Sequence, residues 1–300
     1  DTKGKQTNVL GSSNQFVFKL NNLGFRESLY FLDSDGNRVE NSWDIFEYKW
    51  EYLNDGSVIE DRFNKQGKQV SIRPGFEFYR LKLYFNTLGH ITLMQNIDKN
   101  GNLTENASGA SQDKITTNSN GNFLQWQVLD NKHQLEKGNG PDVAVGLQKF
   151  NKFGYESELE HRDENNRPMY SAYGICISKT KFDKFGNISE RAFYNELRKP
   201  SNHKSAGYHK LKMKWDKFGN SRELLSYFDL NDKPTNHITR GYHSVKYHYN
   251  RNKNLIKIDY LDVKNQLVNR KDNGIAFITY QYNNGVRTGM SRFDKNGKKL

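Results

Sequence analysis

One sequence pattern recurs along almost the whole chain of 300 residues. The stretch WDKFGNSRELLSYFDLNDKP begins at Trp215, and a near copy, FDKFGNISERAFYNELRKP, begins at Phe182. A fixed period of about 20 to 50 residues is typical of repeat architectures. The repeats are spaced by 32 to 34 residues and begin at Leu20, Tyr52, Phe85, Thr117, Phe150, Phe182, Trp215, Tyr249 and Tyr282.

A second, independent marker supports the same frame. An Asp or Asn opens a second turn in every repeat, at Asp33, Asn64, Asp98, Asp130, Asp163, Asn195, Asp229, Asp262 and Asp294. The chain therefore contains eight full repeats and a final half repeat.

Each repeat has the turn chemistry of β-hairpins. In the segment DKFGN, Gly186 and Gly219 occupy the position where a three-residue hairpin loop needs a left-handed backbone. The second turn contains Gly in the early repeats and later changes to a form that ends in Pro168, Pro200 or Pro234. The segments between turns alternate: we expect His209, Leu211, Met213 and Trp215 on one face, and Tyr208, Lys210, Lys212 and Lys214 on the other.

Two strands per repeat require roughly 17 strands or more, whereas twisted open sheets rarely exceed about 10 strands without curling. The sequence therefore predicts an all-β fold, an antiparallel meander of about eight and a half hairpin repeats coiled into a superhelical or partly closed sheet. Residues 20–300 form a single repeat array in this prediction, and residues 1–19 form a flexible lead and a first cap strand. The apolar fraction of 34% and aromatic fraction of 13% predict a thin, aromatic core.

The pattern Y/F/W-D-x-x-G-N, followed by Y-F-D-x-x-x-K-P, resembles the tandem YD/RHS-type β-hairpin repeats of bacterial exported and surface proteins. The resemblance covers Leu20 to Leu300 and implies a repeat geometry rather than a particular activity, because such arrays serve as shells, stalks and adhesive surfaces. It implies an exported bacterial protein that is periplasmic, secreted or at the outer surface. The chain starts at Asp1, and its polar first residues are expected to follow a removed export signal.

Positive charge is concentrated in the C-terminal part of the chain. From Phe182 onward, 24 Lys and Arg residues face 11 Asp and Glu residues, whereas the preceding residues are nearly balanced. We call the cations expected on one sheet face the basic stripe: Lys179, Lys181, Lys210, Lys212, Lys214, Lys246 and His248. The stripe could attract a polyanionic glycan, lipopolysaccharide or a host protein, with nucleic acid less favoured. The alternative is that these lysines confer solubility and prevent pairing of strand edges.

Aromatic side chains recur at the tips of the first turns. Phe153, Phe185 and Phe218, with Leu23 and Leu88 in earlier repeats, occupy the second loop position. Such rings could stack on sugars or nucleobases, or each could pack over the next repeat. The sequence favours packing.

Enzyme chemistry has little support in the sequence. Cys176, His209 and His243 share one repeat position, but positions two strands apart lie roughly 10 Å from each other, so we expect a packed ladder rather than a metal site. Glu158, Glu190 and Glu223 form a similar row, which could supply carboxylates for glycoside hydrolysis but is better explained as cross-strand partners of Lys. No catalytic residue, metal or cofactor is assigned.

The sequence therefore favours a noncatalytic exported repeat protein with an extended binding surface. The alternatives are a polysaccharide-acting enzyme with carboxylates in a curled groove, and a purely structural spacer. No hydrophobic run approaches the roughly 20 residues of a membrane-spanning helix.

Overall fold

The structure, a computed structural model, describes residues 13–300. The described residues form nineteen β-strands and no helix, which confirms the predicted all-β class. Most of the predicted flexible lead lies outside the described residues, and the first strand begins at Gln15.

The chain divides into two compact units. Asp1–Leu147 and Arg162–Asn166 make up unit 1, and Gln148–His161 and Arg167–Leu300 make up unit 2. The strands of unit 1 are β1 (Gln15–Leu20), β2 (Arg26–Leu32), β3 (Arg38–Val39), β4 (Glu47–Tyr52), β5 (Val58–Phe63), β6 (Arg80–Phe85), β7 (Ile91–Asn96), β8 (Gln112–Thr117) and β9 (Phe123–Leu129). Strands β10 (Val145–Phe150) and β11 (Glu156–Arg162) contribute residues to both units. The strands of unit 2 are β12 (Ile177–Phe182), β13 (Ile188–Tyr194), β14 (Lys210–Trp215), β15 (Arg222–Phe228), β16 (Ser244–Tyr249), β17 (Leu255–Leu261), β18 (Phe277–Asn283) and β19 (Val286–Phe293).

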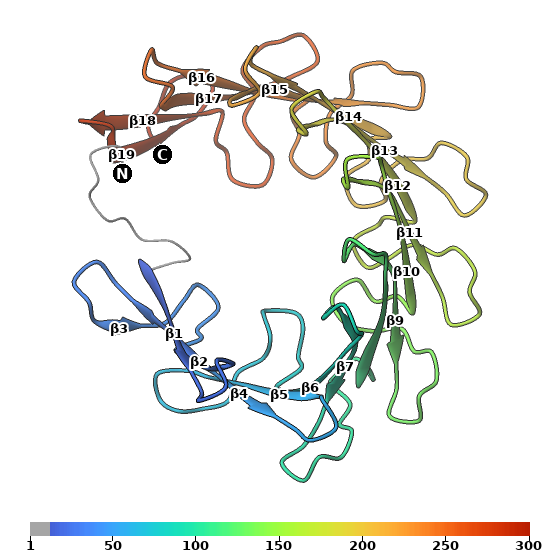
Figure 1. Ribbon diagram of the computed structural model, residues 1–300. Coiled ribbons are helices and arrows are strands. Elements are labelled where there is room, and N and C mark those ends of the chain that lie inside the picture. The colour runs from blue at the N-terminus through green and yellow to red at the C-terminus, as the bar shows by residue number, and fades with distance from the viewer. Residues whose placement is uncertain (1–12) are drawn as a thin grey trace. The chain divides into compact units, whose positions relative to one another are not determined.

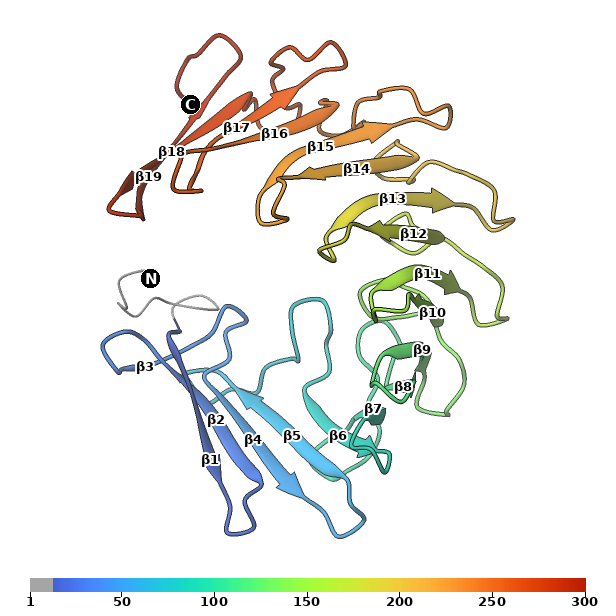
Figure 2. The same ribbon diagram turned by 45° about the horizontal axis from the view of Figure 1, so that its top comes forward.

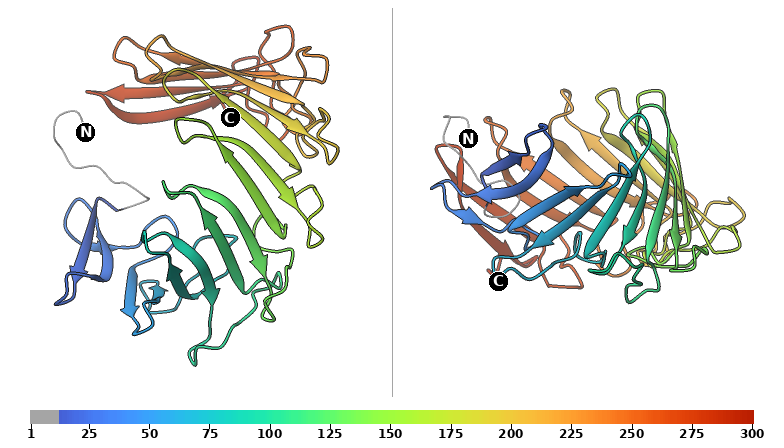
Figure 3. Two further views of the ribbon diagram at one scale, coloured as in Figure 1. Left: turned by 45° about the vertical axis from the view of Figure 1, so that its right-hand side comes forward. Right: turned by 60° about the horizontal axis from the view of Figure 1, so that its bottom comes forward.

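Within each unit, strands pair antiparallel with their neighbours in the chain. The short strand β3 adds one irregularity, because β2 pairs both with β3 and with β4. Unit 1 is a meander through β8–β9, and unit 2 is a meander from β12 to β19 (Figures 1 and 2). Figure 3 shows the hairpin turns at both ends of these strands. The predicted antiparallel meander is therefore confirmed.

The predicted repeat frame coincides with the strands. Each predicted start is the last residue of the first strand of a hairpin, except Tyr282, which is followed by Asn283 in β18. Gly186 and Gly219 have φ angles of 86° and 74°, so the predicted left-handed glycine of the first turn is confirmed. The alternation of side chains and the hairpin turn are local properties, and both were therefore visible in the sequence.

The later second turns keep a left-handed residue without using glycine. Asn166, Arg198, Asp232 and Asn265 have φ angles of 62°, 58°, 59° and 60°. Asn and Asp tolerate this conformation through local hydrogen bonds, whereas Arg is rare there. The prediction identified the proline that follows the first three of these residues and overlooked the left-handed position itself.

A third turn, which the sequence analysis did not predict, separates the second turn from the next strand. In unit 2 these loops carry Tyr208, Tyr242 and Ile275 onto one face of the sheet, where they form a core with Tyr227 and Tyr260. This core of unit 2 is aromatic, as predicted, whereas the buried core of unit 1 is mainly aliphatic. The core of unit 1 contains Val58, Phe78, Leu81, Leu83, Ala110 and Val128.

The predicted placement of Tyr208 on the lysine face is wrong. Tyr208 is buried in the core, and Leu211 packs against the same core. The regular strand β14 begins at Lys210, so strict alternation does not extend back to Tyr208.

Candidate binding surfaces

The basic stripe lies on one face of unit 2, opposite the aromatic core. Across successive strands, Lys181 faces Glu190, Glu190 faces Lys212, and Lys212 faces Ser226. The next row along the strands runs from Lys214 through Leu224 to Lys246. Lysines on the first strand of each hairpin thus alternate with shorter or acidic side chains on the second strand.

Most of the stripe is neutralised by acidic neighbours. Lys210 and Asp232 lie 2.7 Å apart, and their hydrogen bond raises the pKa of the lysine and lowers the pKa of the carboxyl. The other ion pairs are Lys179–Glu158 at 3.7 Å, Lys181–Glu190 at 3.0 Å and Lys214–Glu223 at 2.9 Å, and the Nε2 atom of His248 is hydrogen-bonded to Asp259 at 2.7 Å. The face therefore has mixed charge, in line with the expected pairing of the acidic row with lysines, and only part of the stripe is left for an external anion.

Two lysines of the stripe differ from the rest. Lys212 and Lys246 are exposed and make no ion pair with any residue that the structure describes. The ammonium of Lys212 lies 4.6 Å from the ring centre of Phe228, a contact that leaves it accessible to an external anion. These two side chains are the cations on this face with the greatest capacity to bind an external anion.

A shallow groove of about 870 Å³ crosses β15, β16 and β17 on the same face. Leu224 and Leu261 contribute apolar surface to it, and Lys246 is one of its cations. Asp216 also lines the groove, and its hydrogen bond with Lys253, at 2.9 Å, lowers its pKa to about 2. We call this feature the unit 2 groove. Lys253 was missed in the sequence analysis because it lies in a turn rather than on the stripe.

The row of acidic side chains pairs with lysine, as predicted. Glu190 pairs with Lys181, and Glu223 pairs with Lys214. Glu158 contacts Lys149 at 2.9 Å and also pairs with Arg198, which comes from the second turn of the next hairpin.

The Cys176, His209 and His243 positions form a buried ladder, as expected. The Nδ1 atoms of His209 and His243 lie 3.0 and 3.1 Å from the carbonyl oxygens of Ser201 and Thr235. A carbonyl can only accept, so each Nδ1 carries the proton and donates it. Cys176 is 1% exposed, and burial raises the pKa of its thiol to about 12. Among residues 13–300, no three His, Cys, Asp or Glu side chains are placed to share a metal ion.

The aromatic turn tips differ from one another in exposure. Phe153 is 71% exposed, Phe218 is 55% exposed and Phe185 is 47% exposed. The Phe185 ring packs on the next repeat, because a Cβ atom built on Gly219 would lie 2.5 Å from its Cδ2. Packing over the next repeat therefore holds for Phe185, while the other two rings remain largely in solvent.

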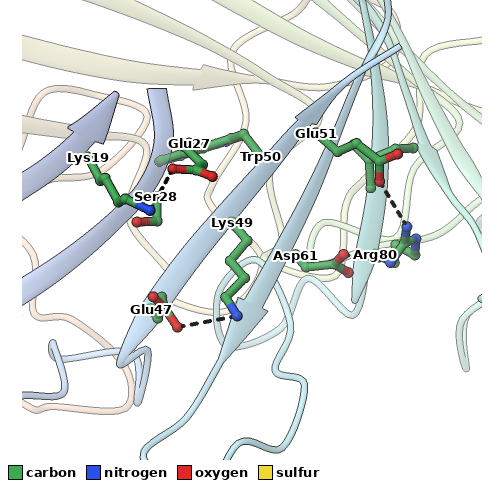
Figure 4. Close-up of a pocket in the computed structure, with 10 residues that line it drawn as sticks. Lys19, Glu27, Ser28, Glu47, Lys49, Trp50, Glu51, Asp61 and Arg80 are labelled. Atoms are coloured by element: carbon green, nitrogen blue, oxygen red, sulfur yellow. Dashed lines mark hydrogen bonds and ion pairs between the residues drawn. The ribbon is translucent and has the colours of Figure 1, made fainter. Parts of the chain in front are cut away.

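Unit 1 has its own polar pocket of about 510 Å³ (Figure 4). Lys19 pairs with Glu27 at 2.9 Å, and Lys49 pairs with Glu47 at 3.7 Å. Arg80 contacts Asp61 at 2.6 Å. The cations of this pocket are thus satisfied by acids within it.

In the part of the chain that the structure describes, no helix is long and apolar enough to cross a bilayer.

Comparisons with known proteins give distant structural matches only. No family model matches the chain, and no curated protein matches it. A crystal structure of TcdB2-TccC3-TEV matches with 10% identity and a TM-score of 0.32, over 90% of this chain and 13% of that chain. TcdB2-TccC3 without its hypervariable C-terminal region matches with 12% identity and a TM-score of 0.37, over 96% and 16% of the two chains. A porin-like protein from Bacteroides uniformis matches with 10% identity and a TM-score of 0.20, over 91% and 86%. This chain spans less than a fifth of the length of either TcdB2-TccC3 chain.

Proposed function

We propose that this chain is a noncatalytic, exported bacterial repeat protein of the YD/RHS-like kind, and that it binds an anionic polysaccharide in the unit 2 groove. The observation that carries the proposal is the contrast within the basic stripe. Four of its lysines are paired with carboxylates and His248 is hydrogen-bonded to Asp259, whereas Lys246, in the groove, and Lys212, on the same face, are exposed and have no described ion-pair partner.

The groove offers the contacts that a charged sugar chain requires. Leu224 and Leu261 can contact the apolar faces of sugar rings, and polar side chains around them can bind hydroxyl groups. Lys212 and Lys246 supply the cations for carboxylate or sulfate groups. The carboxylates lining the groove already pair with cations, which limits their repulsion of an anionic ligand.

The enzyme alternative requires a carboxyl that stays protonated as a general acid. In the groove, Asp216 has a lowered pKa, and Glu223 and Asp259 are each ion-paired. These contacts favour binding over hydrolysis. Lipopolysaccharide and host proteins are the other candidate partners, and a binding array that includes them would test both.

The proposal is tested with the double variant Lys212→Gln/Lys246→Gln of the full chain, by calorimetric titration with heparin and with a neutral dextran. We expect heparin affinity to fall by about 10- to 100-fold through loss of two charge-assisted contacts. The dependence of log Kd on log salt should become shallower by about one to two units, because fewer counterions are released.

The matched control is Lys199→Gln/Lys233→Gln, which removes the same charge from second turns of unit 2. Both of these lysines are exposed and lack an ion pair with any described residue. If the groove variant kept the wild-type salt slope, or if the control lost as much affinity, the proposal would fail and a structural role would remain.

A further inference from the structure

Three successive hairpins of unit 2 end in the same triplet, Lys-Phe-Gly. We call them the tip row: residues 152–154, 184–186 and 217–219. Their rings are 71%, 47% and 55% exposed, and in each triplet the lysine ammonium lies 4.9 to 5.0 Å from the ring centre. Each tip therefore presents an apolar ring and a cation together.

The three tips form a continuous row. The Nδ2 atom of Asn187 donates to the carbonyl oxygen of Gly219 at 2.8 Å, and the Phe185 ring packs on the same glycine. The hydroxyl of Tyr155 lies against Gly186 in the same way, since a Cβ atom there would be 2.3 Å from it. Successive tips are two strands apart, or about 10 Å. The turns between β12 and β13 and between β14 and β15 lie at the same end of the strands (Figure 2).

Charge distinguishes this edge of unit 2 from the opposite edge. The complete first turns at this edge, residues 151–155, 183–187, 216–220 and 250–254, carry five cations and two carboxylates. Both carboxylates are engaged: Asp183 accepts the backbone N–H groups of Phe185 and Asn187, and Asp216 pairs with Lys253. The second turns at the opposite edge, 195–199, 229–233 and 262–266, expose Leu197, Leu230 and Val263 but have four cations and four carboxylates.

We propose that the tip row docks unit 2 on an anionic lipid bilayer, with the three phenylalanine rings in the interface and the three lysines on phosphate groups. Aromatic and basic side chains together are the combination that binds peripheral proteins to such surfaces. A row of tips can meet a flat surface at three points at once. The unit 2 groove reaches this edge through Asp216 and Lys253, but none of the lysines or rings of the tip row lines it.

A bilayer fits these tips better than a sugar does. Directional hydrogen bonds are needed to orient a glycan, yet the polar side chains that open the tips are used within the turns. Asn151 accepts the N–H groups of Phe153 and Tyr155, and Asp216 accepts those of Phe218 and Asn220. Rings and ammonium groups are what remain for a partner.

The test is flotation of the full chain with vesicles of phosphatidylcholine, with and without phosphatidylglycerol. We expect binding only to the anionic vesicles. Lys152→Gln/Lys184→Gln/Lys217→Gln should lower the partition coefficient by roughly 100-fold, since each basic residue near an anionic surface contributes about five-fold. Phe153→Ser/Phe218→Ser, which spares the packed Phe185, should also lose binding while retaining the wild-type melting temperature.

Two controls make the experiment decisive. Lys199→Gln/Lys233→Gln/Lys264→Gln removes the same charge from the opposite edge and should leave vesicle binding unchanged. Lys246→Gln should also bind vesicles normally, which separates this inference from the groove. Equal loss in the opposite-edge variant, binding to uncharged vesicles, or tip variants that lose heparin binding but keep vesicle binding would each overturn the proposal.

Discussion

The hydroxyl of Tyr249 donates a hydrogen bond of 3.0 Å to the carbonyl oxygen of Arg222, 27 residues earlier in the chain. Tyr249 ends the first strand of one hairpin, and Arg222 begins the second strand of the preceding hairpin. The hydroxyl of Tyr282 donates a hydrogen bond of 3.0 Å to the carbonyl oxygen of Leu255, and the indole N–H of Trp215 donates one of 2.9 Å to the carbonyl oxygen of Ile188. In both cases the two residues are again 27 positions apart in the chain. The aromatic residue that marks each of these repeat starts thus fastens its repeat to the one before.

Removal of this hydroxyl should weaken unit 2 without disturbing its packing. Tyr249→Phe and Tyr282→Phe each leave a backbone carbonyl without its donor, and we expect each to lower the free energy of unfolding by about 0.5 to 1.5 kcal/mol. Urea denaturation followed by the fluorescence of Trp215, the one tryptophan of unit 2, measures the change. Tyr173→Phe, at a residue that is 56% exposed, is the control and should have no effect.

Glycines of the first turn should differ in their tolerance of a side chain. Gly219 has a φ of 74° and contacts the Phe185 ring, whereas Gly89 has a φ of 78° and nothing within 4 Å of a built Cβ atom. Gly89→Ala should cost about 1 to 2 kcal/mol for its left-handed backbone. Gly219→Ala should cost about 1 to 3 kcal/mol more, because the ring must move. Equal losses in the two variants, measured by thermal unfolding, would show that the ring contact is unimportant.

Asp113 should make the stability of unit 1 depend on pH. Its side chain is buried, and burial raises the pKa of its carboxyl to about 7, although Asn139 donates a hydrogen bond to it at 3.2 Å. The folded state therefore holds a proton that the unfolded chain releases near pH 4. The stability that this proton contributes to the folded state is complete below pH 4 and is lost as pH rises toward 7.

Over that range, we expect the free energy of unfolding of the wild type to fall by on the order of 3 kcal/mol relative to that of Asp113→Asn, which cannot ionise. Urea titrations of both proteins at pH 4.5, 6 and 7.5, read by the tryptophans of unit 1, provide the comparison. Parallel stability curves for the two proteins would contradict the prediction.

Deletion of one internal repeat, Phe182 to Lys214, should leave a folded shorter protein, because each strand of unit 2 pairs only with its neighbours in the chain. The deletion removes Arg198, which pairs with Glu158 and Glu160, and brings Asp232 to the same repeat position. The melting temperature of the shortened protein should therefore be lower than that of the full chain. Asp232→Arg in the shortened protein should restore part of the difference. Circular dichroism reports the sheet content. Deletion of half a repeat, residues 182–197, is the control and should unfold unit 2, because it reverses the direction of every later strand.

The candidate surfaces were only partly foreseeable. Alternation placed the lysines of β14 on one face correctly, because the period of two is a property of a single strand. The neutralisation of Lys210 by Asp232 was not foreseeable in this way, since the two residues are 22 positions apart and meet through the second turn. The repeated Lys-Phe-Gly triplet was visible in the sequence, but the exposure of each ring depends on its contact with the neighbouring repeat.

The sequence by itself determined the repeat frame, the hairpins and the left-handed glycine of the first turn. Each of these follows from φ and ψ preferences and side-chain alternation over a few residues. Only the tertiary structure decided which lysines keep a free charge and which aromatic residues form the core. Tyr208 enters the core because a third turn carries it there, and Lys246 stays free because Asp259, which faces it, pairs with His248 and Lys257. These outcomes depend on strand register and on contacts between distant side chains, which no local preference encodes.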